Sequence, residues 1–124
     1  MHEKLRILCV DDDAAGLMIR TMLLERFGYQ VIPASTGERA LGILAGEAID
    51  LAILDDCLGS MTGTDLAERM KKQQPDLRII LLSGPMEISE GLENIDRFLL
   101  KGEGPQRLAA LVRLLTRDKR DHAA

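Results

Sequence analysis

Five short apolar runs, separated by segments with helical periodicity, constrain the fold of this 124-residue chain more than any other feature. The runs span residues 5–10, 31–33, 51–54, 79–82 and 98–100. Most are too short for helices, and several are almost entirely apolar, as expected of strands buried on both faces of a sheet. Strands that alternate with helices predict an α/β fold with a doubly wound parallel sheet.

The first two intervening segments carry signals for helix boundaries. An apolar stripe predicts a first helix over residues 15–27, with Gly28 as its C-terminal cap. The residues predicted to face the core are Ala15, Ile19, Met22 and Leu23, and the spacing of Met18, Met22 and Met70 is also typical of core residues. Ser35 and Glu38 have the spacing of a capping box and predict the start of a second helix.

The later segments predict two more regular helices and one irregular interval. A third helix spans residues 64–73 and stops before Pro75. The last begins at Pro105, and its apolar residues follow the i, i+3, i+4, i+7 pattern through Leu108, Leu111, Val112 and Leu115. Between them, residues 83–97 have room for a short or irregular helix at most. We expect one domain over residues 1–117 and a polar tail over 118–124.

Composition excludes several functional classes. A hydrophobic fraction of 46% supplies one core, and a net charge of −4 is unlike the basic surface of a nucleic-acid-binding protein. The N-terminal apolar run is too short for a secretory signal or a membrane span. Cys9 and Cys57 lack metal-ligand spacing and a disulfide pattern, so a reduced, cytoplasmic protein is expected.

Chemically reactive side chains follow four of the predicted strands. The first strand is followed by Asp11, Asp12 and Asp13, the third by Asp55 and Asp56, the fourth by Ser83 and the fifth by Lys101. Because the carboxyl ends of parallel strands share one edge, where ligands bind, these side chains should converge. Each signal is weak alone, since Asp12 or Asp13 can cap a helix and a lysine is commonly solvated.

Carboxylates that cluster at one edge need a cation to remain ionised together. Oxygen ligands without His or Cys favour Mg²⁺. A carboxylate beside Mg²⁺ can attack phosphorus to form an aspartyl phosphate, while a hydroxyl and an ammonium bind the phosphoryl oxygens. The sequence therefore predicts a magnesium-dependent site for phosphoryl transfer.

Four segments, in this order along the chain, resemble the receiver domains of two-component response regulators: LRILCVDDD, DLAILDDCLGSMTGTDL, RIILLSG and RFLLKG. The resemblance implies a flavodoxin-like fold with a five-stranded parallel sheet in the order 2-1-3-4-5. It also implies five helices, of which the fourth is short or irregular here.

The resemblance assigns roles to individual residues. Asp55 is implied as the phosphoacceptor, and Mg²⁺ is bound directly by Asp12 and Asp55, by Asp11 through water, and by the backbone carbonyl of Cys57. Lys101 pairs with the phosphoryl group and Ser83 donates a hydrogen bond to it. Ser83 and Phe98 form the switch that reshapes a protein-binding face.

The implied partners are a sensor histidine kinase or phosphotransfer protein and a downstream protein target, with a second copy of the chain as a further potential partner. Neither nucleic acid nor membrane is expected to bind directly. The chain is expected to be a phosphoacceptor that slowly loses its phosphoryl group, and not an enzyme in the ordinary sense. Asp56 and Gly102 depart from the family pattern, with an acid and a glycine at positions where an apolar residue and a proline are usual.

Two alternative functions remain open. The shortened interval after Ser83 motivates a receiver-like scaffold that binds partners without phosphorylation. A Mg²⁺-dependent phosphatase with an aspartyl-phosphate intermediate is less well supported, because haloacid dehalogenase-type enzymes need an acid where this chain has Cys57. A flavodoxin is disfavoured, since three aspartates after the first strand would repel a flavin phosphate.

Overall fold

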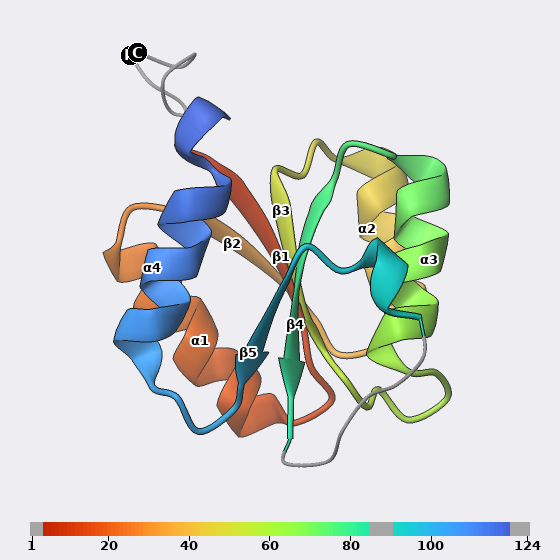
Figure 1. Cartoon of the computed structure of the whole chain (residues 1–124), viewed down its shortest axis with the longest axis horizontal. Helices are drawn as coiled ribbons and strands as arrows, with labels where there is room; N and C mark the ends of the chain where they lie inside the picture. Colours follow the sequence, from red (N-terminus) through yellow and green to blue (C-terminus); the bar gives the residue numbers. More distant parts are fainter. Residues whose placement is uncertain (1–3, 85–90, 120–124) are drawn as a thin grey trace.

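The computed structural model describes residues 4–84 and 91–119 and contains one parallel sheet with two layers of helices (Figure 1). The strands are β1 (Arg6–Val10), β2 (Gln30–Ala34), β3 (Leu51–Asp55), β4 (Arg78–Ser83) and β5 (Arg97–Leu100). The helices are α1 (Ala14–Arg26), α2 (Gly37–Gly46), α3 (Gly63–Gln73) and α4 (Pro105–Leu115), with a 3₁₀ turn η1 (Leu92–Asn94). The strand order β2-β1-β3-β4-β5 confirms the predicted fold class and topology.

The sheet separates two aliphatic cores. Helices α1 and α4 cover one face, and α2 and α3 cover the other (Figure 1). All five residues of β3 are buried, because this strand lies at the centre of the sheet with helices on both sides. Asp55, the last residue of β3, is consequently placed where water has little access.

Two helix starts test the predicted boundaries. Pro105 is the first residue of α4, and Leu108, Val112 and Leu115 are buried, which confirms the last predicted helix. The capping box predicted from Ser35 is wrong, because Thr36 is the N-cap of α2 and its hydroxyl accepts a hydrogen bond from the Arg39 N–H at 3.1 Å.

Helix α1 buries a different face from the predicted one. Ile19 is 67% exposed, Met22 is 58% exposed and Ala15 is also exposed, so the predicted stripe was wrong for these three residues. Leu17 and Leu24 face the core instead, with Arg20 on the same side of the helix. The reason is that α1 carries apolar residues around most of its circumference, and hydrophobic periodicity cannot choose between two apolar faces. Of the three methionines predicted to be core residues, Met70 is buried and Met18 is exposed.

The interval after β4 contains little regular structure among its described residues. Gly91 has a φ of 74°, and the single 3₁₀ turn η1 follows it before β5 begins. This supports the expectation of a short or irregular fourth helix, while residues 85–90 lie outside the described ranges.

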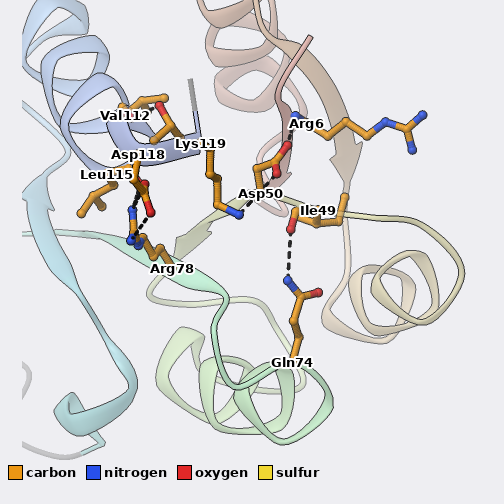
Figure 2. Close-up of polar contacts among 10 residues, drawn as sticks. Arg6, Ile49, Asp50, Gln74, Arg78, Val112, Leu115, Asp118 and Lys119 are labelled. Atoms are coloured by element: carbon orange, nitrogen blue, oxygen red, sulfur yellow. Dashed lines mark hydrogen bonds and ion pairs between the residues drawn. The ribbon is translucent and has the colours of Figure 1, made fainter. Parts of the chain in front are cut away.

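Polar contacts fasten the amino-terminal edge of the sheet (Figure 2). Asp50 accepts a hydrogen bond from the Arg6 N–H at 2.8 Å and lies 3.4 Å from the Lys119 ammonium. Arg78 binds both carboxylate oxygens of Asp118, at 2.7 and 2.9 Å, and also donates to the Leu115 carbonyl at the end of α4. These contacts anchor the end of α4 to the sheet, far from the carboxyl edge.

Candidate functional site

Three carboxylates meet at the carboxyl edge of the sheet, as the strand-end pattern predicted. Asp11, Asp12 and Asp55 each place an oxygen within 4.8 Å of the other two. Asp11 and Asp55 are each only 3% exposed, whereas Asp12 is exposed to solvent. Two adjacent strands, β1 and β3, position the cluster, since Val10 is paired with Leu54 in the parallel register and Asp11 and Asp55 are the next residues.

The three aspartates of the loop after β1 make different contacts. Asp13 is the N-cap of α1, and its carboxylate accepts a hydrogen bond from the Gly16 N–H at 3.3 Å. Asp11 accepts one from the Asp13 N–H at 2.9 Å, which fixes the direction of the buried carboxylate. Because Asp13 does the capping, Asp12 is left to face the cluster.

Lys101 pairs with the buried carboxylate of Asp55. It lies directly after β5, and its backbone N–H donates to the Ser83 carbonyl at 2.9 Å, so the strand register places it at this edge. Its ammonium is also 3.7 Å from a carboxylate oxygen of Asp56. One exposed cation thus serves two adjacent acids.

Asp56 connects β3 with the end of β4. Its second carboxylate oxygen accepts a hydrogen bond from the Gly84 N–H at 3.1 Å, and its own N–H donates to Asp55 Oδ1 at 3.0 Å. The Asp56 carboxylate therefore lies against Lys101 and the backbone after Ser83, and does not point freely into solvent.

Gly63, the first residue of α3, allows the helix to approach the acceptor strand. A Cβ at this position would collide with the backbone carbonyl oxygen of Asp55 and lie 2.6 Å from Leu81 Cδ1. The Gly63 N–H donates to the Asp56 carbonyl at 3.0 Å. The loop that leads from Asp55 to α3 is therefore held closely against the end of β3.

The remaining predicted residues lie around this pocket. Ser83 is buried at the end of β4, beside Lys101. Cys57 is exposed and pairs in an isolated bridge with Thr62. Phe98 lies on β5 with its side chain 46% exposed, so its ring faces outward in this structure.

Arg20 is a charged residue of the pocket that sequence reasoning missed. Its guanidinium forms an ion pair with Asp11, and the side chains of the two residues are 17% and 4% exposed. Helical periodicity gives no reason to place an arginine on the buried side of α1. Its spacing from Gly16, four residues earlier on the same face, is the signal that was available.

The pocket shifts the pKa values of several groups. Burial raises the pKa of Asp55, the Lys101 hydrogen bond and charge oppose this, and the charge of Asp56 adds to it. For Lys101, burial favours the neutral amine, but Asp55 and Asp56 outweigh it and the pKa is raised. Burial raises the pKa of the Cys9 thiol, although the nearby Arg20 guanidinium acts in the opposite direction. Cys9 is thus a neutral thiol under the pocket.

The donor set fits a hard divalent cation. Three carboxylates converge, and the 4.8 Å limit on their separation is compatible with shared coordination. Mg²⁺ takes oxygen ligands at about 2.0–2.1 Å and keeps several waters, so it does not need an enclosed protein cage. Asp12, which is exposed, gives such a hydrated ion access from solvent.

Comparisons with known proteins agree with this geometry. Residues 7–113 match the family described as "Response regulator receiver domain". The structure superimposes with a TM-score of 0.88 on a CheY-like receiver domain from Methanospirillum hungatei JF-1, which is 31% identical; the match covers 96% of this chain and 99% of that one. The chain belongs to the response regulator receiver domain family of two-component systems.

Two curated relatives are longer than this chain. The chain is 33% identical to a probable transcriptional regulator ycf27 of Porphyridium aerugineum, over 93% of this chain and 49% of that protein. It is also 33% identical to the alkaline phosphatase synthesis transcriptional regulatory protein PhoP of Bacillus subtilis, over 90% of this chain and 48% of that protein. The chain therefore spans about half the length of these curated relatives.

A further solved structure carries ligands. The response regulator TrrA from Thermotoga maritima, solved in complex with Mg(2+)-BeF, is 28% identical with a TM-score of 0.81, over 90% of this chain and 98% of that one. Within residues 4–84 and 91–119, no helix is both long and apolar enough to cross a membrane.

Proposed function

We propose that the chain is the phosphoacceptor module of a two-component phosphorelay, in which Asp55 receives a phosphoryl group from a histidine kinase or phosphotransfer protein. The observation that carries the proposal is the placement of a buried acceptor carboxylate between two further acids and a lysine ammonium. The resemblance to receiver domains implies that this combination serves the formation of an aspartyl phosphate. The Mg²⁺ complex of TrrA adds support through a relative.

In the proposed reaction, a carboxylate oxygen of Asp55 attacks the phosphorus atom of a phosphohistidine. The new O–P bond forms as the P–N bond breaks, and the departing imidazole nitrogen keeps the electron pair and takes up a proton. Mg²⁺, held by Asp11, Asp12, Asp55 and the Cys57 carbonyl, would supply positive charge to the phosphoryl oxygens. Lys101 lies beside Asp55, and its ammonium would stabilise the same charge.

The output of the module is a change at the end of β4. Ser83 is buried beside Lys101, and its hydroxyl is the proposed hydrogen-bond donor to the phosphoryl group. Phe98 is paired in register with Leu81 on the neighbouring strand and is half-exposed. Movement of Ser83 toward the phosphoryl group opens space that the ring of Phe98 can occupy, which changes the surface seen by a partner.

The test is intact mass spectrometry after incubation with acetyl phosphate. We expect a single phosphoryl adduct that requires Mg²⁺, disappears with a chelator and is lost in Asp55→Asn. A matched control is Asp76→Asn, which makes the same chemical change at an exposed turn before β4, at the opposite edge of the sheet. This variant should form the adduct at the parental rate.

The same experiment separates the alternatives. Absence of the adduct in a folded protein would contradict the proposal and favour a scaffold that binds partners without phosphorylation. Release of inorganic phosphate from a small phosphate ester, over many turnovers, would favour the phosphatase.

A further inference from the structure

Arg20 is a second cation of the acidic pocket, and it approaches from a helix instead of from a strand end. Its guanidinium pairs with Asp11 at a side-chain exposure of 17%, compared with 43% for Lys101. Arg20 is therefore held at the buried side of the pocket, whereas Lys101 is at the solvent side. An ion pair that is shielded from water is screened less by salt than an exposed pair.

The first turn of α1 leaves space for this arrangement. Gly16 precedes Arg20 by four residues, and a Cβ at Gly16 would lie 3.5 Å from Arg20 Nη2 and 3.5 Å from Asp11 Oδ2. The same Cβ would be 3.0 Å from the capping carboxylate of Asp13. The Arg20 guanidinium and the carboxylates of Asp11 and Asp13 therefore lie close to the backbone of Gly16.

The surroundings keep the guanidinium near the acids. Arg20 and Lys101 both line a cavity of about 210 Å³ between α1 and α4, whose other walls are largely apolar and include Leu23, Leu99 and Leu108. Moving a charged group from a carboxylate into an apolar cavity is unfavourable. Arg20 also lies near Cys9 and Lys101, since its positive charge acts to lower the pKa of both groups.

We infer that Arg20 is a built-in counter-ion that competes with the divalent cation for Asp11 and thereby sets how much Mg²⁺ the pocket needs. The inference rests on the proposed function, since it concerns the same metal site. Two physical effects act in one direction. The guanidinium occupies a carboxylate oxygen that could otherwise hold a metal-bound water, and its positive charge repels a cation that enters the cluster.

The consequence is a division of labour among the three acids. Asp12 is exposed and contacts an arriving hydrated ion first. Asp11 binds the ion only when its ion pair with Arg20 breaks. A receiver with an apolar residue at this position would bind Mg²⁺ more tightly. In this chain, phosphorylation should therefore require a higher concentration of Mg²⁺.

The experiment is isothermal titration calorimetry of the whole chain with MgCl₂ at constant ionic strength. Arg20→Met keeps the length of the side chain and removes the charge, and it should bind Mg²⁺ about tenfold more tightly, equivalent to ~1.4 kcal/mol. Arg20→Lys keeps the charge but loses the planar guanidinium with its paired donors, and its Mg²⁺ affinity should lie between those of the parent and of Arg20→Met. Arg26→Met is the matched control, because Arg26 is exposed in the last turn of the same helix, and it should leave the affinity unchanged.

Folding is checked independently of binding. Loss of Arg20 leaves the charge of Asp11 facing two other acids, so Arg20→Met should melt at a lower temperature in chelator and regain more stability on addition of Mg²⁺ than the parent does. If Arg20→Met does not fold in chelator, Arg20→Gln, which retains hydrogen-bond donors, takes its place in the titration.

Failure of this inference is distinguishable from failure of the proposed function. Equal or weaker Mg²⁺ binding by a folded Arg20→Met, together with a Mg²⁺-dependent adduct on Asp55, would overturn the role of Arg20 alone. Tighter binding by Arg20→Met in a chain that never forms the adduct would support the counter-ion and overturn the phosphoacceptor.

Discussion

The two edges of the sheet handle charge in opposite ways. At the amino edge, acids and bases are matched: Asp50 pairs with Lys119 and Asp118 with Arg78 (Figure 2). In the same way, Asp96 lies 3.0 Å from the Lys71 ammonium. At the carboxyl edge, Asp11, Asp12 and Asp55 face one another.

The amino edge stabilises the fold, whereas the carboxyl edge carries the proposed site. Several carboxylates of the amino edge also accept backbone N–H groups, as Asp96 does from Ile79 at 2.8 Å, so they hold the strands together. The carboxylates of the carboxyl edge repel each other, and Arg20 and Lys101 offset that repulsion only in part. Sites built for ligands commonly reduce stability in this way.

The largest expected effect concerns Lys101, the solvent-side cation of the carboxyl edge. In Lys101→Ala, the rate of adduct formation with acetyl phosphate should fall about 100-fold, ~2.7 kcal/mol, because a donor aimed at the developing charge is lost. The measurement is the time course of the adduct by intact mass. Lys72→Ala, which removes an exposed lysine that pairs within α3, is the control. A rate within twofold of the parent would show that Lys101 only neutralises Asp55.

Stability should change with opposite sign at the two edges. Asp50→Ala should lower the free energy of unfolding by about 1–2 kcal/mol, because the Arg6 N–H loses its acceptor and Lys119 its partner. Asp12→Asn should raise it by about 0.5 kcal/mol in chelator, because one like charge leaves the cluster.

Urea unfolding of both variants in chelator and in Mg²⁺ tests this difference. The gain in Asp12→Asn should disappear in Mg²⁺, because the parent then recovers stability from the bound ion. If Asp12→Asn is destabilised even in chelator, the view of the carboxyl edge as a source of repulsion is wrong.

Sequence reasoning located the carboxyl edge because its residues follow strand ends. Asp55 and Ser83 each close a buried apolar run, and Lys101 follows the short edge strand β5. Parallel strands bring such ends together whatever the helices do. The same logic could not find Arg20, which is presented by a helix. Its position depends on which face of α1 packs against the sheet.

Helix faces were predictable where apolar residues form one stripe. In α4, Leu108, Val112 and Leu115 are apolar on one side, and the prediction was correct. In α1, Met18 and Ile19 are apolar but exposed. Local spacing cannot decide between two such faces, because the choice depends on which side packs against β1 and α4. The partner of Asp56, the Gly84 N–H, is likewise set by tertiary packing between β3 and β4.

The smallest expected effect is a difference in pH dependence between the edges. Hydrogen bonds from Arg78 lower the pKa of Asp118, so the unfolded chain binds more protons at this group than the folded chain does. The stability that Asp118 contributes is therefore present above about pH 3.9 and is lost as the pH falls through the folded pKa. Burial raises the pKa of Asp55, so the folded chain binds more protons and stability falls as pH rises from about 3.9 to the folded pKa.

Urea midpoints between pH 3 and pH 7, in chelator, measure both contributions. Relative to the parent, Asp118→Asn should lose stability most at neutral pH and least in acid. Asp55→Asn should gain most at neutral pH, because it removes a buried charge that is costly only when ionised. Parallel difference curves for the two variants would contradict the contrast, since the edges would then respond to protons alike.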